Sequence, residues 1–222
     1  MIDLHTHSFK SDGVLAPAEL ARQAEVVGYK AIAITDHADF SNFEELLNGL
    51  LKLCPILNEH MNITVFPGIE ITYVPPAAIG DIAGRARELG AQIIGVHGET
   101  IAEVVPPGTN KAALLSDIDF LAHPGLISVE DVKLAAERNI PLEITTRRGH
   151  SLTNGHVAKL AKEYGAPMVM NNDAHGPGDF VSKEMQYKIG MGAGLSSKEV
   201  DTILSYSWKV VDMELQKQIN IC

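Results

Sequence analysis

The sequence predicts an α/β fold in which seven parallel strands, each followed by a helix, form a closed or distorted (β/α)7 barrel of the TIM type. Short apolar runs alternate with amphipathic helical stretches along the chain. Parallel neighbours need crossover connections, so this alternation favours a parallel sheet covered by helices. Seven units of about 30 residues need roughly 210 residues, close to the 222 present. An eight-unit barrel typically needs about 250 residues, and an open doubly wound sheet is the competing architecture.

Each predicted strand is a short run of apolar and β-branched residues bounded by turn or helix signals. The clearest runs are KAIAIT, ITVFPGIEI and AQIIGV. The seven strands are expected at residues 1–5, 30–35, 63–71, 91–96, 119–122, 141–145 and 167–171. A further edge strand is expected near residues 208–212, in the tail of the chain.

The helices expected between these strands carry start and stop signals. Pro17 opens the first helix and Gly28 ends it, because proline suits the first turn and glycine the residue after the last. Pro55 is expected to interrupt the second helix. Ser128 and Asp131 resemble a capping box at the start of the fifth helix. The helices are expected at residues 17–27, 42–59, 77–89, 110–115, 128–139 and 154–164, with another after residue 196.

The composition is that of an ordinary globular protein with an acidic balance. Hydrophobic residues make up 45% of the chain and charged residues 21%, which argues against disorder, collagen-like repeats and a coiled coil. Lys and Arg number 18 and Asp and Glu 28, so the formal net charge is −10. A protein that binds nucleic acid in bulk normally has the opposite sign, so we do not expect that partner.

The sequence shows no sign of secretion or membrane insertion. Two cysteines, Cys54 and Cys222, are too few for a disulfide framework or a cysteine-based zinc site, and they favour a reducing compartment. No apolar run approaches the roughly 20 residues of a membrane span, and no signal-peptide pattern opens the chain. We therefore expect a single cytoplasmic domain over residues 1–222 without a membrane partner, and a homo-oligomer is compatible with the sequence.

Nine histidines are an unusual number beside six Phe and five Tyr. Six of the seven predicted strands deliver a histidine or a carboxylate at or near their carboxyl ends. The catalytic loops of (β/α) barrels converge at that end of the strands, so these side chains are expected to form one site. The candidate metal ligands are His5, His7, His37, His97, His123 and His175, together with Asp12, Glu70 and Asp173.

The chemistry of these residue types favours divalent metal ions. Alternate residues of a strand share a face, so His5 and His7 point the same way, as do Asp173 and His175. Adjacent buried imidazoles are costly unless their lone pairs are satisfied, and neutral imidazole and carboxylate are ligands of divalent metals. Nine candidate ligands exceed the needs of one four-coordinate ion. Two or three ions with a bridging carboxylate are therefore predicted.

Simpler explanations apply to single histidines. One histidine after a strand is more often a hydrogen-bonded residue at the rim than a ligand, but here that explanation would have to hold several times independently. His60 and His156 lie in predicted helices and are expected to face solvent. His150 follows the sixth strand, on the expected active face, and no partner can be assigned to it.

Six short motifs, in this order, resemble those of the PHP (polymerase and histidinol phosphatase) superfamily. The resemblance spans residues 3–175 and implies a distorted seven-stranded barrel with a trinuclear metal site and phosphoesterase activity. The motifs are DLHTHS at 3–8, SDG at 11–13, ITDH at 34–37, GIEI at 68–71, HPG at 123–125 and NDAH at 172–175.

The resemblance implies three metal subsites. By position, the first takes His5, His7, Glu70 and Asp173, the second shares Glu70 with His97 and His123, and the third takes Asp12, His37 and His175. Many histidinol phosphatases have a histidine near the position of Asp12, and this chain offers Ser11-Asp12-Gly13 instead. Zn, Mn or Fe are the expected ions, and the oxygen ligand at the third subsite also allows Mg. Asp3 and Asp36 are expected to orient ligand imidazoles, and a cap at the end of the strand is the alternative role for Asp36.

The function that this site predicts is hydrolysis of a small phosphomonoester, with histidinol phosphate as one option. His5, His7, Glu70 and Asp173 would act through the bound ions, and a hydroxide held by the ions would attack phosphorus in line. The expected substrate ligands are Arg147 and Arg148, which suit bidentate phosphate contacts, with His150 and Lys111 as further candidates.

Two other functions are compatible with such a site. The first is a phosphodiesterase or exonuclease, which the low aromatic content of 5% and the lack of a basic track disfavour. The second is a metal-binding or regulatory subunit without activity, which the complete ligand set disfavours.

Overall fold

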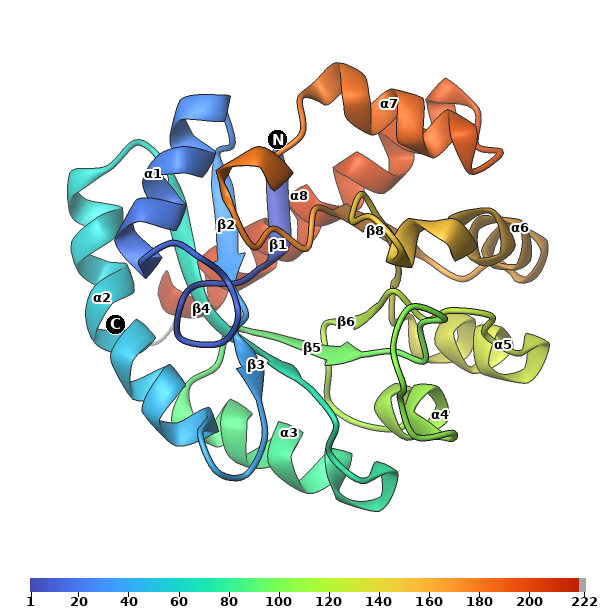
Figure 1. Ribbon diagram of the computed structural model, residues 1–222, viewed down its shortest axis with the longest axis horizontal. Coiled ribbons are helices and arrows are strands. Elements are labelled where there is room, and N and C mark those ends of the chain that lie inside the picture. Colours follow the sequence, from blue (N-terminus) through green and yellow to red (C-terminus); the bar gives the residue numbers. More distant parts are fainter. Residues whose placement is uncertain (220–222) are drawn as a thin grey trace.

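The chain folds into a nearly closed barrel of seven parallel strands surrounded by helices (Figure 1). The computed structural model describes residues 1–219, with side chains up to residue 216. The strands follow one another around the barrel in chain order, β1-β2-β4-β5-β6-β7-β8. A parallel bridge between Thr6 and Ala174 joins the segment after the last strand to the first strand. This topology confirms the predicted (β/α)7 barrel and excludes the open doubly wound sheet.

Seven of the strands lie within two residues of the predicted positions. Their bounds are β1 Ile2–Thr6, β2 Ala31–Ile34, β4 Thr64–Ile71, β5 Ile93–His97, β6 Phe120–Ala122, β7 Leu142–Thr145 and β8 Met168–Asn171. An additional two-residue strand, β3 His37–Ala38, was not predicted. It pairs with β4 and sets His37 opposite Glu70 in the sheet.

The helices also follow the predicted signals. Their bounds are α1 Pro17–Val27, α2 Phe43–His60, α3 Ile79–Leu89, α4 Thr109–Leu114, α5 Val129–Arg138, α6 Asn154–Tyr164, α7 Lys183–Gly192 and α8 Ser197–Ile219, with 3-10 turns η1 Pro76–Ala78, η2 His150–Thr153 and η3 Pro177–Asp179. Ser128 caps α5 by accepting a hydrogen bond from the Asp131 backbone N–H, as predicted. Helix α7, which Ser182 caps in the same way, was not predicted.

Pro55 does not interrupt α2, contrary to the prediction. The helix runs without a break from Phe43 to His60 with the proline inside it. Proline removes one backbone hydrogen bond from a helix, whereas Cys54 and Leu57 on either side are buried in the layer between helix and sheet. Packing of the apolar face therefore outweighs the lost hydrogen bond.

The edge strand predicted at residues 208–212 is also wrong, because α8 continues through this segment. Val200, Ile203, Val210 and Val211 are buried at helical spacing. The short run around Val210 looks β-like by itself, but its apolar residues serve one face of a long helix. Cys222 and the end of the tail lie outside the described residues.

Helix α8 covers the amino-terminal end of the barrel. It contacts β1 and β8, and Figure 1 shows it passing behind the strands. Its Val210 and Val211 join a cluster of apolar side chains contributed by the strands. The other members of this cluster are Ile2, Leu4, Ala31, Ala33, Phe66, Ile93, Phe120, Ala122 and Val169. One end of the barrel is thus packed with hydrocarbon, which leaves the other end for polar side chains. None of the helices within residues 1–219 has the length and hydrophobicity that crossing a bilayer requires.

Gly95 on β5 provides the space that the ring of Phe120 fills. The two residues pair across β5 and β6, and a Cβ at position 95 would lie 2.5 Å from Cζ of Phe120. Gly95→Ala is therefore expected to lower the free energy of unfolding by about 1–3 kcal/mol through overpacking. Urea denaturation followed by circular dichroism measures this change.

Gly84→Ala on α3 is the matched control, because nothing lies within 4 Å of the added Cβ. The gain in helix propensity is expected to stabilise the protein by up to about 1 kcal/mol. Equal effects of the two substitutions would contradict the packing argument.

Candidate metal centre

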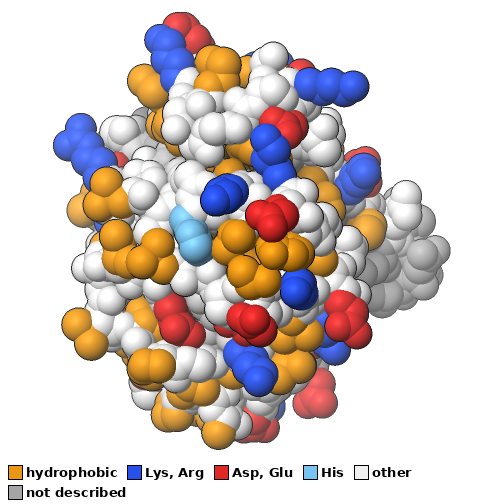
Figure 2. Space-filling model, turned by 90° about the vertical axis from the view of Figure 1, so that its right-hand side faces the viewer, with side chains coloured by type: hydrophobic (Ala, Val, Ile, Leu, Met, Phe, Trp, Pro, Cys, Tyr) orange, Lys and Arg blue, Asp and Glu red, His pale blue; other side chains and the backbone are white. Residues whose placement is uncertain are grey.

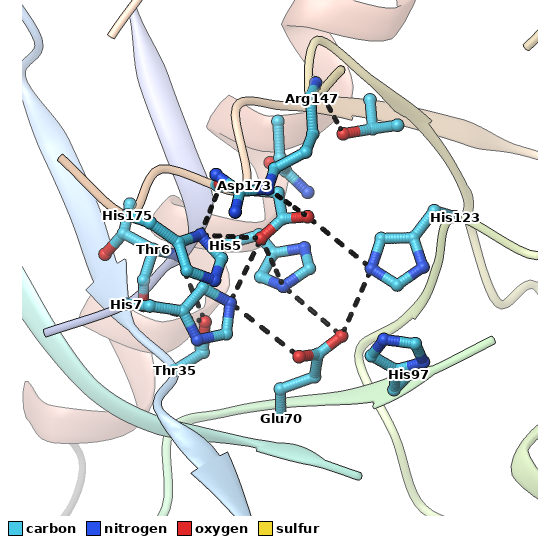
Figure 3. A network of polar contacts seen from close by, with 12 residues as sticks. His5, Thr6, His7, Thr35, Glu70, His97, His123, Arg147, Asp173 and His175 are labelled. Atoms are coloured by element: carbon cyan, nitrogen blue, oxygen red, sulfur yellow. Dashed lines mark hydrogen bonds and ion pairs between the residues drawn. The ribbon is translucent and has the colours of Figure 1, made fainter. Parts of the chain in front are cut away.

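The structure brings all nine predicted metal ligands to the carboxyl end of the barrel strands. Figure 3 shows Glu70 and Asp173 near the middle of the cluster, with imidazole rings directed toward them from several strands. His5 lies on β1, His37 on β3, Glu70 on β4 and His97 at the end of β5. The remaining ligands follow strands closely: His7 and Asp12 follow β1, His123 follows β6, and Asp173 and His175 follow β8.

The innermost group consists of His5, His7, Glu70 and Asp173, all buried. His5 Nε2 lies 3.3 Å from Glu70 Oε1 and 3.6 Å from Asp173 Oδ1. His7 Nε2 lies 3.2 Å from Asp173 Oδ1 and 3.7 Å from Glu70 Oε2. One donor atom each from His5, His7 and Glu70 falls within 4.8 Å of the others. This spacing suits ligands that converge on a common ion.

Two further groups flank the innermost one, and His123 also forms a group with His5 and Asp173. Glu70 forms a second cluster with His97 and His123, again with donor atoms within 4.8 Å of one another. His123 Nε2 lies 3.5 Å from Glu70 Oε1. The third cluster combines Asp12, His37 and His175 with His7. It is the most accessible of the three, because the side chain of Asp12 is 54% exposed.

The strongest sign that these donors need a ligand is their lack of hydrogen bonds. Among the described residues, eight buried side-chain N or O atoms have no hydrogen-bond partner, and six of them belong to predicted metal ligands. Those six are His5 Nε2, His7 Nδ1, His7 Nε2, Glu70 Oε1, Glu70 Oε2 and His123 Nδ1. A buried polar atom without a partner costs about 1–3 kcal/mol. Imidazole nitrogen and carboxylate oxygen are the donors that Zn, Mn and Fe accept, so the residues fit divalent ions.

Electrostatics holds two of these groups in the protonation states that metal binding requires. Burial alone raises the pKa of Glu70, but the adjacent His5 and His37 outweigh it and hold this pKa well below its usual value. Burial and the neighbouring His97 lower the pKa of His123 well below its usual value. Neighbouring carboxylates act in the opposite direction on His5 and His37 and raise the pKa of each ring despite burial, so a metal ion would displace protons there.

Two of the predicted ligands lie at strained backbone positions. His123 has φ of 23° and Asp173 has φ of 52°, both in the left-handed region that non-glycine residues seldom adopt. Gly125, two residues after His123, has φ of 64°, and a Cβ there would lie 1.8 Å from the carbonyl oxygen of Glu99. Such strain persists only where the surrounding fold enforces it, and it is concentrated at functional sites.

Asp3 and Asp36 hold the backbone near the predicted ligands rather than the imidazole rings; for Asp3 this is contrary to the prediction, and for Asp36 it fits the alternative of a cap at the strand end. Asp3 Oδ1 accepts hydrogen bonds from the backbone N–H groups of His5 and Asn172, at 3.2 and 3.1 Å. Asp36 accepts hydrogen bonds from the backbone N–H and the hydroxyl of Ser8, both at 2.7 Å. Burial raises the pKa of Asp3 to about 7.

The four predicted substrate ligands occupy different surroundings. Arg147 borders the centre (Figure 3), with Nε 3.8 Å from Asp173 Oδ2. His150 is buried, and its ring stacks on that of His123 with centroids 4.2 Å apart. Arg148 is exposed on the same loop as Arg147, and Lys111 is exposed on α4. The substrate-binding roles of all four stay predictions.

Two carboxylates beside the centre were not predicted. Glu143 on β7 is buried, and its Oε1 accepts a 2.8 Å hydrogen bond from His5 Nδ1. The sequence does carry a signal for Glu143, because it is the one acidic residue in the apolar run PLEIT at 141–145. Glu103 belongs to an exposed loop, where no sequence pattern distinguishes it. Its carboxylate lies 3.2 Å from His97 Nε2, and the hydrogen bond from His97 lowers the pKa of Glu103 to about 2.

Comparison with known sequences identifies several relatives. A protein of Methanocaldococcus jannaschii named "Uncharacterized protein MJ1295" is 47% identical over 207 residues, 92% of this chain and 95% of that protein. A probable phosphatase of Shewanella pealeana is 30% identical over 83% of this chain and 82% of its own length. The DNA polymerase/3'-5' exonuclease PolX of Bacillus subtilis is 28% identical over 78% of this chain, but only 34% of its own length is matched.

Comparison with solved structures supports the fold. A Listeria monocytogenes protein described as a candidate histidinol phosphatase superposes with a TM-score of 0.62 over 84% of this chain and 100% of its own. The two share 14% sequence identity, so this likeness concerns the fold alone. The family model described as "PHP domain" matches residues 3–165, nearly three quarters of the sequence. The chain therefore belongs to the PHP domain family.

Proposed function

We propose that this protein is a metal-dependent phosphoesterase that hydrolyses a small phosphomonoester. The observation that carries the proposal is the cluster of buried nitrogen and oxygen atoms without hydrogen bonds at the end of the barrel. Divalent ions bound by such donors polarise phosphoryl oxygens and make water acidic enough to act as a nucleophile near neutral pH. The names of relatives such as the probable phosphatase of Shewanella pealeana support this reaction class.

The three clusters would hold two or three ions of Zn, Mn, Fe or Mg. Glu70 belongs to both the first and the second cluster, so its two carboxylate oxygens can serve two ions. His7 belongs to both the first and the third cluster, but each of its ring nitrogens can bind only one ion. The first and second subsites are buried and the third is exposed through Asp12, so we expect the third to exchange its ion most readily.

Arg147 is the residue best placed to bind the phosphate group. Two carboxylates hold its guanidinium: Nε lies 3.8 Å from Asp173 Oδ2, and an Nη atom lies 3.4 Å from Asp179 Oδ2. The side chain remains 29% exposed, so part of its donor edge can reach a phosphate at the open end of the barrel. A guanidinium can donate two parallel hydrogen bonds to phosphate oxygens. Arg148, His150 and Lys111 would contact other parts of the substrate, for which histidinol phosphate is one option.

Hydrolysis of phosphodiesters or nucleic acid ends is the alternative. The similarity to PolX favours it, although this chain spans only about a third of that protein. The net charge of −10 does not suit a long polyanion. On the face shown in Figure 2, Lys and Arg side chains are interspersed with Asp and Glu and form no continuous basic track. We therefore favour the monoester.

A substrate panel distinguishes these reactions. We expect hydrolysis of phosphomonoesters with Mn, Zn or Mg, and at most slow hydrolysis of bis-p-nitrophenyl phosphate. Phosphate release and nitrophenol absorbance measure the two activities. Preference for the diester would overturn the monoester assignment, and a lack of all turnover with every metal would overturn the enzyme assignment.

Removal of metal is expected to destabilise the fold. A ligand that binds only the folded state at 100 times its Kd adds about 2.7 kcal/mol of stability. For a domain of this size that corresponds to a Tm change of roughly 5–10 °C. Differential scanning calorimetry of chelator-treated protein, before and after addition of Zn or Mn, measures the change. A Tm indifferent to every divalent ion would contradict the metal centre.

Loss of an inner ligand is expected to abolish turnover. His5→Ala and Glu70→Ala each remove a buried donor from the first subsite, and Glu70→Ala also removes one from the second. Activity is expected to fall by at least about a hundredfold, with fewer ions found by elemental analysis. His60→Ala is the control, because the His60 side chain is 68% exposed at the end of α2. Retained activity in either inner variant would contradict the assignment.

Replacement of Arg147 tests phosphate binding. Arg147→Lys keeps the charge but loses the planar pair of donors. We expect KM for a phosphomonoester to rise roughly tenfold to hundredfold, since hydrogen bonds to charged groups contribute about 1.5–3 kcal/mol. Metal content should stay the same. Arg138→Lys, at an exposed position in the last turn of α5, is the control, and an equal effect of both substitutions would contradict the role of Arg147.

A further inference from the structure

Glu143 hydrogen-bonds two residues of the predicted metal centre, His5 and His123. It lies on β7 with no exposed surface. Its Oε1 is 2.8 Å from His5 Nδ1 and 2.8 Å from Asn171 Nδ2. Its Oε2 accepts a 2.9 Å hydrogen bond from the backbone N–H of His123. One carboxylate on β7 thus contacts β1, β8 and the segment after β6.

The hydrogen bond to His5 determines which ring nitrogen can bind metal. A carboxylate only accepts hydrogen bonds when it is ionised, so His5 must carry its proton on Nδ1 in this contact. In the neutral imidazole that binds metal, Nε2 of His5 then keeps its lone pair, and this atom has no hydrogen-bond partner. That atom lies 3.3 Å from Glu70 Oε1 and 3.6 Å from Asp173 Oδ1, inside the first cluster. Glu143 therefore directs the free lone pair of His5 into the centre.

The hydrogen bond to His123 acts on the backbone. His123 has the smallest positive φ in the described chain, 23°, in a region that costs about 1–3 kcal/mol for a non-glycine residue. A buried N–H held by a carboxylate opposes that cost, because charge-assisted hydrogen bonds are roughly twice as strong as neutral ones. The ring of His123 lies in the second cluster, so the position of this backbone sets the position of a second ligand.

We propose that Glu143 is a positioning residue that fixes the tautomer of His5 and the backbone of His123, and thereby couples the first and second metal subsites. The inference rests on the proposed function only in taking these subsites to hold ions. Glu143 itself does not belong to any of the candidate ligand clusters among the described residues. Its contribution is orientation of ligands, which in metal sites typically changes affinity by about 10–100-fold.

Glu143→Gln tests the proposal because an amide cannot replace both oxygens. If the amide oxygen faces His5, the NH2 group faces the His123 N–H and two donors meet. If the oxygen faces His123, the NH2 group faces His5 Nδ1 and favours the tautomer with its proton on Nε2, the metal-facing atom. Either orientation breaks one of the two contacts while side-chain volume is kept.

Metal affinity of the purified full chain is the first readout, measured by competition with a chromophoric chelator for Zn. Glu143→Gln is expected to weaken binding about 10–100-fold. Asp119→Asn is the matched carboxylate-to-amide control: Asp119 Oδ2 accepts hydrogen bonds from Arg87 and the Ile94 N–H, 2.8 and 2.7 Å away, at the start of β6. The control is expected to lower Tm but leave Zn affinity within about twofold. Equal losses of affinity in the two variants would overturn the proposal.

The second readout is the His5 Nδ1 proton, observed by 15N–1H NMR of the wild-type protein. A hydrogen-bonded Nδ1–H protected from exchange is expected both with and without Zn, and it should be lost or broadened in Glu143→Gln. A wild-type His5 without a proton on Nδ1 would overturn the proposal even if the variant fails to fold. Failure of the wild-type protein to bind any metal would instead overturn the proposed function, and the metal-free spectrum still decides the role of Glu143.

Discussion

The rest of the structure depends on one constraint, the burial of polar atoms to which the described residues offer ion pairs but no hydrogen bonds. Six such atoms belong to four side chains at one end of the barrel. A cluster of this kind is stable only where the surrounding fold prevents it from collapsing into ordinary hydrogen bonds. The apolar cluster at the other end of the barrel, closed by α8, supplies the rigid support. The apolar packing at one end of the barrel and the polar cluster at the other therefore depend on each other.

The fold could be predicted where local signals and packing agree. The seven main strands are short apolar runs bounded by turn residues and helix-capping signals, so their positions can be predicted from the sequence. Long-range packing explains the two wrong predictions. Pro55 lies within α2, where the nearby Cys54 and Leu57 pack against the sheet, and the β-like run at Val210 lies on the buried face of α8. The short strand β3 forms only because β4 is beside it.

The candidate site was predictable to the extent that its residues stand at strand ends. Histidine and carboxylate at those positions are visible in the sequence, and the structure gathers all nine. Contacts made by pairing between distant segments are not visible. The sequence places Asp3 and Asp36 beside the predicted ligands, but it does not indicate that they accept hydrogen bonds from backbone N–H groups. The carboxylate of Glu103 lies 3.2 Å from His97 Nε2. The path of the loop brings it there, and no periodic sequence pattern predicts that path.

The location of the ligands along the chain has a consequence for biosynthesis. His5 and His7 belong to the first strand, whereas Asp173 and His175 follow the last, and the two ends meet where Thr6 pairs with Ala174. Chains emerge from the ribosome amino terminus first, so the predicted first subsite lacks a ligand until Asp173 has been made. Until then, His5 and His7 belong to an incomplete set of predicted ligands. The complete set of predicted ligands therefore exists only in the finished barrel.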